Sequence, residues 1–155
     1  MEIAFDLETV WKRLSRVNSL VFKATAGTTS NSGWNGEGRG SVVVESVDSD
    51  TMLFHEDGMW KPETGKDLTF KNVYRWKALH ESHSLRLEHL RFGHNHPVYL
   101  FDLEQADEVT WKSVEPHVCR DDLYTAIMKL DGEVLTLHWT IEGPAKNESI
   151  HYSYQ

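Results

Sequence analysis

The sequence predicts an all-β protein, an up-and-down antiparallel closed barrel of about eight to ten strands with one N-terminal amphipathic helix. Two observations predict this fold class. Apolar residues recur at helical spacing in one segment near the N-terminus, whereas beyond residue 20 they alternate with polar residues between short turns. A sheet of so many strands would expose its edges, and closing it into a barrel removes them. Such a barrel has room for side chains or for one small ligand.

The predicted helix spans residues 6–17. Asp6 is a suitable N-cap, because its carboxylate can accept hydrogen bonds from the free amides of the first turn. The apolar residues of this segment share one helical face: Leu7, Val10, Trp11, Leu14 and Val17. We expect this face to cover one mouth of the barrel. A helix that docks on a partner protein is the alternative.

The strands are predicted over residues 20–154. Asp131-Gly132 lies between two alternating segments and is a strong hairpin signal, and Gly143-Pro144 turns the chain into the last strand. No linker, internal repeat or shift in composition divides the chain. Residues 1–155 are therefore expected to form a single domain.

Composition restricts the partners of this protein. Sixteen Lys and Arg against 24 Asp and Glu give a net charge of −8, so nucleic acid is not an expected partner. No apolar run approaches the roughly 20 residues of a membrane-spanning helix, and no membrane partner is expected. The single cysteine cannot form an internal disulfide, and the N-terminal residues show no signal-peptide pattern. We expect a cytoplasmic protein whose homo-oligomeric state stays open.

Several short motifs occur in a fixed order along most of the chain. They are Gly36-Glu37-Gly38-Arg39-Gly40, Asn72-Val73-Tyr74-Arg75-Trp76, His89-Leu90-Arg91-Phe92-Gly93, Pro97 to Leu103, His117-x-Cys119-x-x-Asp122-x-Tyr124 and Trp139-x-Ile141-x-Gly143-Pro144-x-Lys146. Together they resemble an uncharacterised bacterial and fungal family of small calycin-like barrel proteins, related in architecture to lipocalins and fatty-acid-binding proteins. The resemblance implies a barrel and brings no substrate, cofactor or catalytic residue. The glycine-rich motif also loosely resembles the opening of the haem-binding nitrobindins.

Polar residues in phase with apolar ones are the most informative candidates for a site. His89 and Arg91 follow Leu85 and Leu87 at a spacing of two, so an unbroken strand would point all four inward. An inward charge is costly unless it is paired, solvated or bound to a ligand. Arg91 could hold a carboxylate or phosphate in bidentate fashion, with His89 beside it.

Two structural alternatives exist for this pair. A β-bulge near Glu88 would turn Arg91 outward. An inward Arg91 could instead form an ion pair with Asp102 or Asp122.

The leading hypothesis is noncovalent binding of a small, partly apolar, anionic molecule in the barrel cavity. The expected ligand-binding residues are Tyr74, Arg75, Trp76, His89, Arg91, Tyr124 and Trp139. A second hypothesis is an enzyme of isomerase or lyase type that uses the same cavity for acid–base chemistry, with His89, His117 and Tyr124 as candidate catalytic residues. A third is a filled, ligand-free barrel that contacts another protein.

We expect no metal site and no cofactor. His80-x-x-His83 and His94-x-His96 would each supply only half of a zinc site, which needs three or four ligands. Haem held by one histidine is the alternative, although the covalent attachment pattern Cys-x-x-Cys-His is absent.

Overall fold

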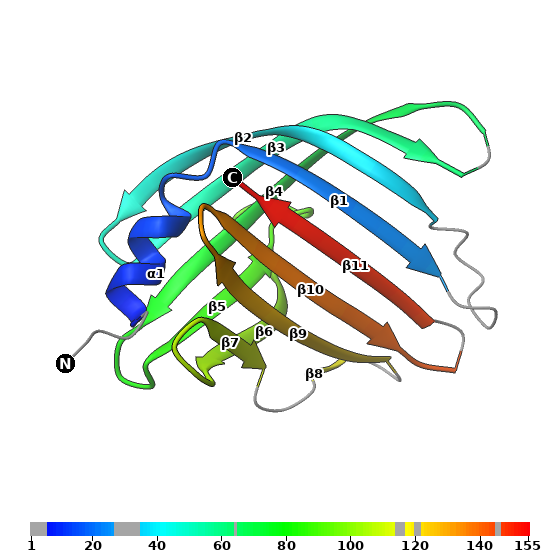
Figure 1. The fold of residues 1–155 in the computed structure, drawn as a ribbon. Helices are drawn as coiled ribbons and strands as arrows, with labels where there is room; N and C mark the ends of the chain where they lie inside the picture. The colour runs from blue at the N-terminus through cyan, green and yellow to red at the C-terminus, as the bar shows by residue number, and fades with distance from the viewer. Residues whose placement is uncertain (1–5, 27–34, 64, 114–116, 120–121, 145–146) are drawn as a thin grey trace.

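Antiparallel strands dominate the structure, a computed structural model that describes residues 6–26, 35–63, 65–113, 117–119, 122–144 and 147–155. The elements in chain order are α1 (Leu7–Leu14), β1 (Ser19–Ala26), β2 (Gly36–Asp48), β3 (Thr51–Pro62), β4 (Leu68–Leu79), β5 (Ser84–His89), β6 (Val98–Gln105), β7 (Thr110–Ser113), β8 (His117–Cys119), β9 (Asp122–Asp131), β10 (Val134–Glu142) and β11 (Asn147–Tyr154). One short helix therefore precedes a series of strands (Figure 1).

The strands close into a barrel. Each strand from β1 to β6 pairs with the next one, then β7 pairs with β9, β9 with β10, β10 with β11, and β11 with β1. Within the described residues, ten antiparallel strands complete this ring, and the three-residue β8 pairs with a second part of the same β9 edge. The predicted closed up-and-down barrel is confirmed.

Helix α1 lies across one end of the barrel (Figure 1). The Asp6 carboxylate accepts a hydrogen bond of 2.9 Å from the Thr9 amide, which is the predicted N-cap. The helix ends at Leu14, three residues before the predicted end, because the chain tightens into a turn that leads to Ser19 at the start of β1. Its apolar face packs into the barrel core, and Leu14 is only 1% exposed.

Alternation along the strands separates the barrel interior from its outer surface. Near α1 the interior is filled by large apolar side chains, with Phe54, Trp76, Phe101 and Trp111 each at most 1% exposed. Fewer interior residues are buried toward the opposite end, where strands β2, β3 and β4 extend beyond the rest (Figure 1). The barrel is therefore closed by α1 and a packed core at one end.

Candidate functional site

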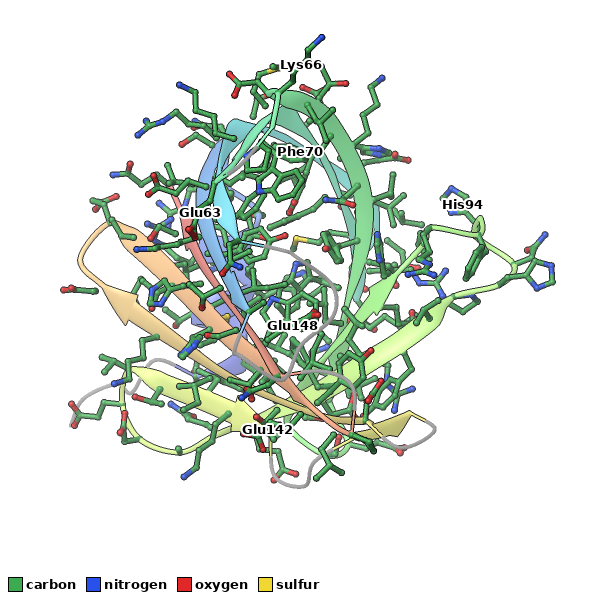
Figure 2. The ribbon with its side chains drawn as sticks, turned by 90° about the vertical axis from the view of Figure 1, so that its right-hand side faces the viewer. Glu63, Lys66, Phe70, His94, Glu142 and Glu148 are labelled. Carbon is green, nitrogen blue, oxygen red and sulfur yellow. The ribbon has the colours of Figure 1, made fainter. Side chains whose placement is uncertain are left out.

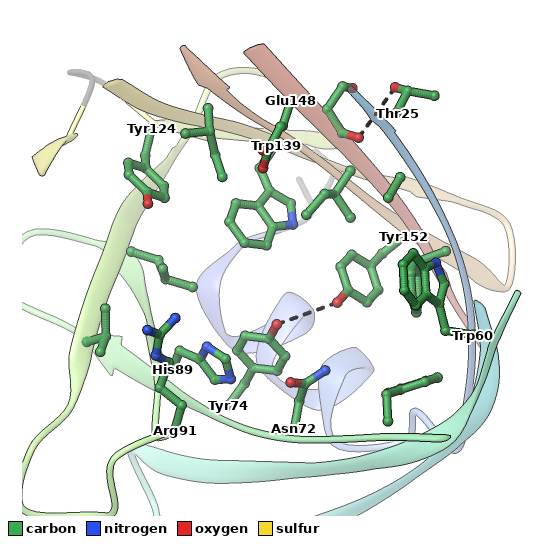
Figure 3. Close-up of a pocket in the computed structure, with 18 of the residues that line it drawn as sticks. Thr25, Trp60, Asn72, Tyr74, His89, Arg91, Tyr124, Trp139, Glu148 and Tyr152 are labelled. Atoms are coloured by element: carbon green, nitrogen blue, oxygen red, sulfur yellow. Dashed lines mark hydrogen bonds between the residues drawn. The ribbon is translucent and has the colours of Figure 1, made fainter. Parts of the chain in front are cut away.

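A cavity of about 440 Å³ lies in the half of the barrel away from α1, within the size range of small-molecule sites. Figure 2 faces this end of the molecule, with Lys66 of the β3–β4 connection on one side and Glu142 at the end of β10 on the other. The lining comes from strands around the ring, and it is mostly aromatic and aliphatic. The larger aromatic side chains of the lining are Phe22, Trp60, Phe70, Tyr74, Tyr124, Trp139 and Tyr152 (Figure 3).

The phase of β5 places His89 and Arg91 on the cavity. The sequence left open a β-bulge near Glu88 that would turn Arg91 outward. A register irregularity does occur opposite Glu88, but the extra residue is Leu100 on β6. Leu87 pairs with Phe101 and Glu88 pairs with Tyr99, so β5 itself keeps its alternation. His89 and Arg91 consequently both line the cavity (Figure 3).

Arg91 has no carboxylate partner among the described residues. Its guanidinium lies 4.7 Å from the centre of the Phe92 ring, at an exposed position just beyond the end of β5. The other arginines of this wall are paired, since Arg75 donates to Glu88 at 2.7 Å and Arg86 makes two hydrogen bonds to Asp102. Arg91 is thus the only cationic side chain in the described lining and is free to pair with an anion.

His89 stacks on Tyr74 at the cavity wall. The two ring centres are 4.6 Å apart with the planes inclined by 22°. Burial, together with the nearby Arg91 guanidinium, lowers the pKa of His89 to about 4. The imidazole is therefore neutral at pH 7 and offers one hydrogen-bond donor and one acceptor.

Glycine in β2 makes room for the aromatic wall on the other side of the cavity. Gly38 points inward beside Phe22, and a Cβ at this position would overlap the Phe22 ring. The ring occupies that space and lies 5.4 Å from the rings of both Phe70 and Tyr152. The glycine-rich motif noted in the sequence therefore serves packing at the cavity, and haem binding gains no support from it.

A buried polar cluster lies next to the cavity. Glu56 is 2% exposed, and its Oε2 accepts a 2.7 Å hydrogen bond from the Tyr154 hydroxyl, whereas Oε1 has no partner among the described residues. Burial raises the pKa of Glu56 to about 8, an effect that the Tyr154 hydrogen bond only partly offsets. The ring of Tyr154 stacks on Tyr152, whose hydroxyl lies 3.5 Å from that of Tyr74. We call Glu56, Tyr74, Tyr152 and Tyr154 the tyrosine cluster.

The predictions from sequence did not include Glu56 or Tyr152. A signal for Glu56 was present, because it follows Met52 and Phe54 and precedes Trp60 at even spacing on β3. Tyr152 alternates with Ile150 and Tyr154 on β11, which marks an inward face in the same way.

The structure brings five of the seven predicted ligand-binding residues to the cavity, namely Tyr74, His89, Arg91, Tyr124 and Trp139. Arg75 is not in the lining and instead pairs with Glu88. Trp76 is also outside the lining; it is 1% exposed, in the core, with its ring centre 6.1 Å from that of Phe54. His117 lies on β8, and its side chain is outside the described part of the structure.

No group of three or more His, Cys, Asp or Glu side chains that could hold a metal ion occurs among the described residues. His80, from one of the half-sites seen in the sequence, instead makes a 2.7 Å contact with Asp50. No helix in the described ranges is long and apolar enough to cross a membrane.

The fold and the site define a class of protein, a closed antiparallel β-barrel with an aromatic-lined cavity in the half away from its helix. The chain belongs to a family of unknown function, DUF6314, whose model matches residues 12–155. Neither the curated proteins nor the solved structures contain a match to this chain. The expected membership of an uncharacterised barrel family is confirmed at this level, and the likeness to calycins stays a prediction because no homology supports it.

Proposed function

We propose that this protein binds a small, partly apolar, anionic molecule noncovalently in the barrel cavity. The observation that carries the proposal is the unpaired Arg91 on the wall of a mostly apolar cavity of about 440 Å³. Apolar walls with few polar groups are typical of small-molecule sites, and a guanidinium recognises carboxylate or phosphate in bidentate fashion. The proposal includes a calycin-like architecture, in which the barrel encloses the ligand.

Two further features support binding over the alternatives. The cavity argues against a barrel filled by its own side chains, which the protein-interaction hypothesis required. A pKa of about 4 makes His89 a weak base at neutral pH, so no acid–base chemistry is proposed for it.

The net charge of −8 disfavours nucleic acid as the partner, and the single cysteine is compatible with a cytoplasmic setting.

Binding can be tested with anilinonaphthalene sulfonate, an anionic aromatic probe whose fluorescence rises in apolar surroundings. We expect saturable binding of one probe per chain, weakened about 10-fold by Arg91→Gln, because a charge-assisted hydrogen bond contributes about 1.5 kcal/mol or more. Arg39→Gln makes the same charge change at an exposed β2 position outside the cavity lining and should leave the affinity unchanged.

The proposal fails if the probe does not bind at a single site, or if Arg91→Gln and Arg39→Gln behave alike. Native mass spectrometry of the purified protein provides an independent measurement. A bound mass that is lost on denaturation would supply the chemical class of a co-purified ligand.

A further inference from the structure

The inner part of the cavity carries hydroxyl groups whose hydrogen-bonding capacity is not used up within the protein. The hydroxyls of Tyr74 and Tyr152 point toward each other in the cavity wall, 3.5 Å apart (Figure 3). Two hydroxyls have two hydrogens, and their mutual contact uses only one. Among the described residues no other partner of either hydroxyl occurs, so one O–H remains available to an acceptor in the cavity.

These hydroxyls act as neutral donors. Burial raises the pKa of both Tyr74 and Tyr152, so neither phenol ionises near neutral pH. The side chain of Asn72, which precedes Tyr74 by two positions on β4, points into the same space (Figure 3). The wall around the tyrosine pair therefore offers uncharged hydrogen-bonding groups within an otherwise apolar surface.

Charge determines which end of an anionic ligand could reach these donors. The cationic group of the lining is Arg91, beyond the end of β5, and it is exposed to solvent. Behind the tyrosine pair, the buried Glu56 carboxyl accepts from Tyr154 and has no cation beside it among the described ion pairs. A ligand carboxylate next to Glu56 would be desolvated without a counter-charge, which is costly. A neutral oxygen at this position would not incur that penalty.

We propose that the ligand is an amphiphilic acid with an oxygen at its far end, held with its anion outward on Arg91 and a hydroxyl or carbonyl oxygen inward on Tyr74 and Tyr152. This inference rests on the proposed function, because it assigns the second end of the same ligand. The hydrocarbon between the two polar groups lies against the aromatic wall that contains Phe22 and Trp139. The tyrosine pair then selects oxygenated acids over plain ones.

The test compares straight-chain ω-hydroxy acids of increasing length with n-alkanoates of the same carbon number, by isothermal titration calorimetry at pH 7. At the best length we expect the hydroxy acid to bind about 5- to 10-fold more tightly, the effect of one net hydrogen bond. The double variant Tyr74→Phe/Tyr152→Phe should abolish this ratio, because either hydroxyl left alone would still have its own hydrogen to donate to the ligand. Arg91→Gln should weaken both ligands by the same factor.

Tyr154→Phe is the matched control. It removes a hydroxyl two residues from Tyr152 on the same inner face of β11, outside the cavity lining. It should keep the ratio, and circular dichroism would verify that both variants are folded. Equal affinities of the two ligand series at every length, or a ratio that survives loss of both hydroxyls in Tyr74→Phe/Tyr152→Phe, would overturn the inference. If alkanoates still bind in an Arg91-dependent manner, the proposed function stands without the inference. If neither series binds, the inference falls, and the anilinonaphthalene sulfonate titration decides the proposed function separately.

Discussion

The buried carboxyl of Glu56 should make the stability of this protein decrease with rising pH over the neutral range. The folded state holds the pKa of Glu56 at about 8, against an ordinary value of 4.5. Below pH 4.5 the carboxyl is protonated in both the folded and the unfolded chain and contributes no pH dependence. Between pH 4.5 and pH 8 the unfolded chain releases the proton and the folded chain retains it. The free energy of unfolding therefore falls by about 1.4 kcal/mol for each pH unit in this interval and levels off above it.

Glu56→Gln isolates this contribution, because glutamine keeps an acceptor for Tyr154 and does not titrate. The difference in unfolding free energy, variant minus wild type, should increase by about 3 kcal/mol between pH 5 and pH 7. Urea unfolding at several pH values gives this difference, and other titrating groups cancel in it. Glu37→Gln, which replaces an exposed carboxyl on β2, serves as the control for the loss of one carboxylate.

A constant difference for Glu56→Gln across this range would refute the reasoning. It would mean that Glu56 loses its proton at an ordinary pH in the folded chain, and hence that water or a cation reaches Oε1. A difference that decreases with pH would refute it equally.

Three further predictions concern the cavity and the helix. Gly38→Ala should destabilise the fold by about 1–3 kcal/mol and weaken probe binding, because its Cβ displaces the Phe22 ring; an unchanged melting temperature would contradict this. An NMR titration should show His89 neutral down to about pH 4, with a higher midpoint in Arg91→Gln; a midpoint near 6.5 in the wild type would contradict the burial of the ring. Leu14→Ala should cost about 2–5 kcal/mol in urea unfolding, because Leu14 is 1% exposed in the core; a loss under about 1 kcal/mol would show that α1 is not needed to close the barrel.

Local patterns predicted the parts of this structure that depend on neighbouring residues in the chain. The Asp6 cap, the Asp131-Gly132 hairpin and the closed ring follow from turn chemistry, capping and alternation. Alternation also places Tyr74 and Arg75 on opposite faces of β4, so both could not line one cavity. The structure accordingly pairs Arg75 with Glu88.

The remaining features depend on contacts between distant segments. The position of the bulge at Leu100 is a matter of register between β5 and β6, and either strand of that pair could have carried it. Glu56 meets Tyr154 only because the ring closes through β11 and β1, which brings residues 98 positions apart into contact. Sequence alternation shows that such residues point inward but does not show which of them meet.

The short strand β7 has a consequence for how the barrel opens. Among the described residues, three residue pairs join β7 to β6 and three join it to β9, whereas ten pairs join β3 to β4. Transient opening of a closed sheet requires the least free energy where the fewest hydrogen bonds must break together. The amides of β7 should therefore exchange with solvent deuterium faster than those of β3 and β4, and the cylinder should come apart first along this line when force or denaturant is applied.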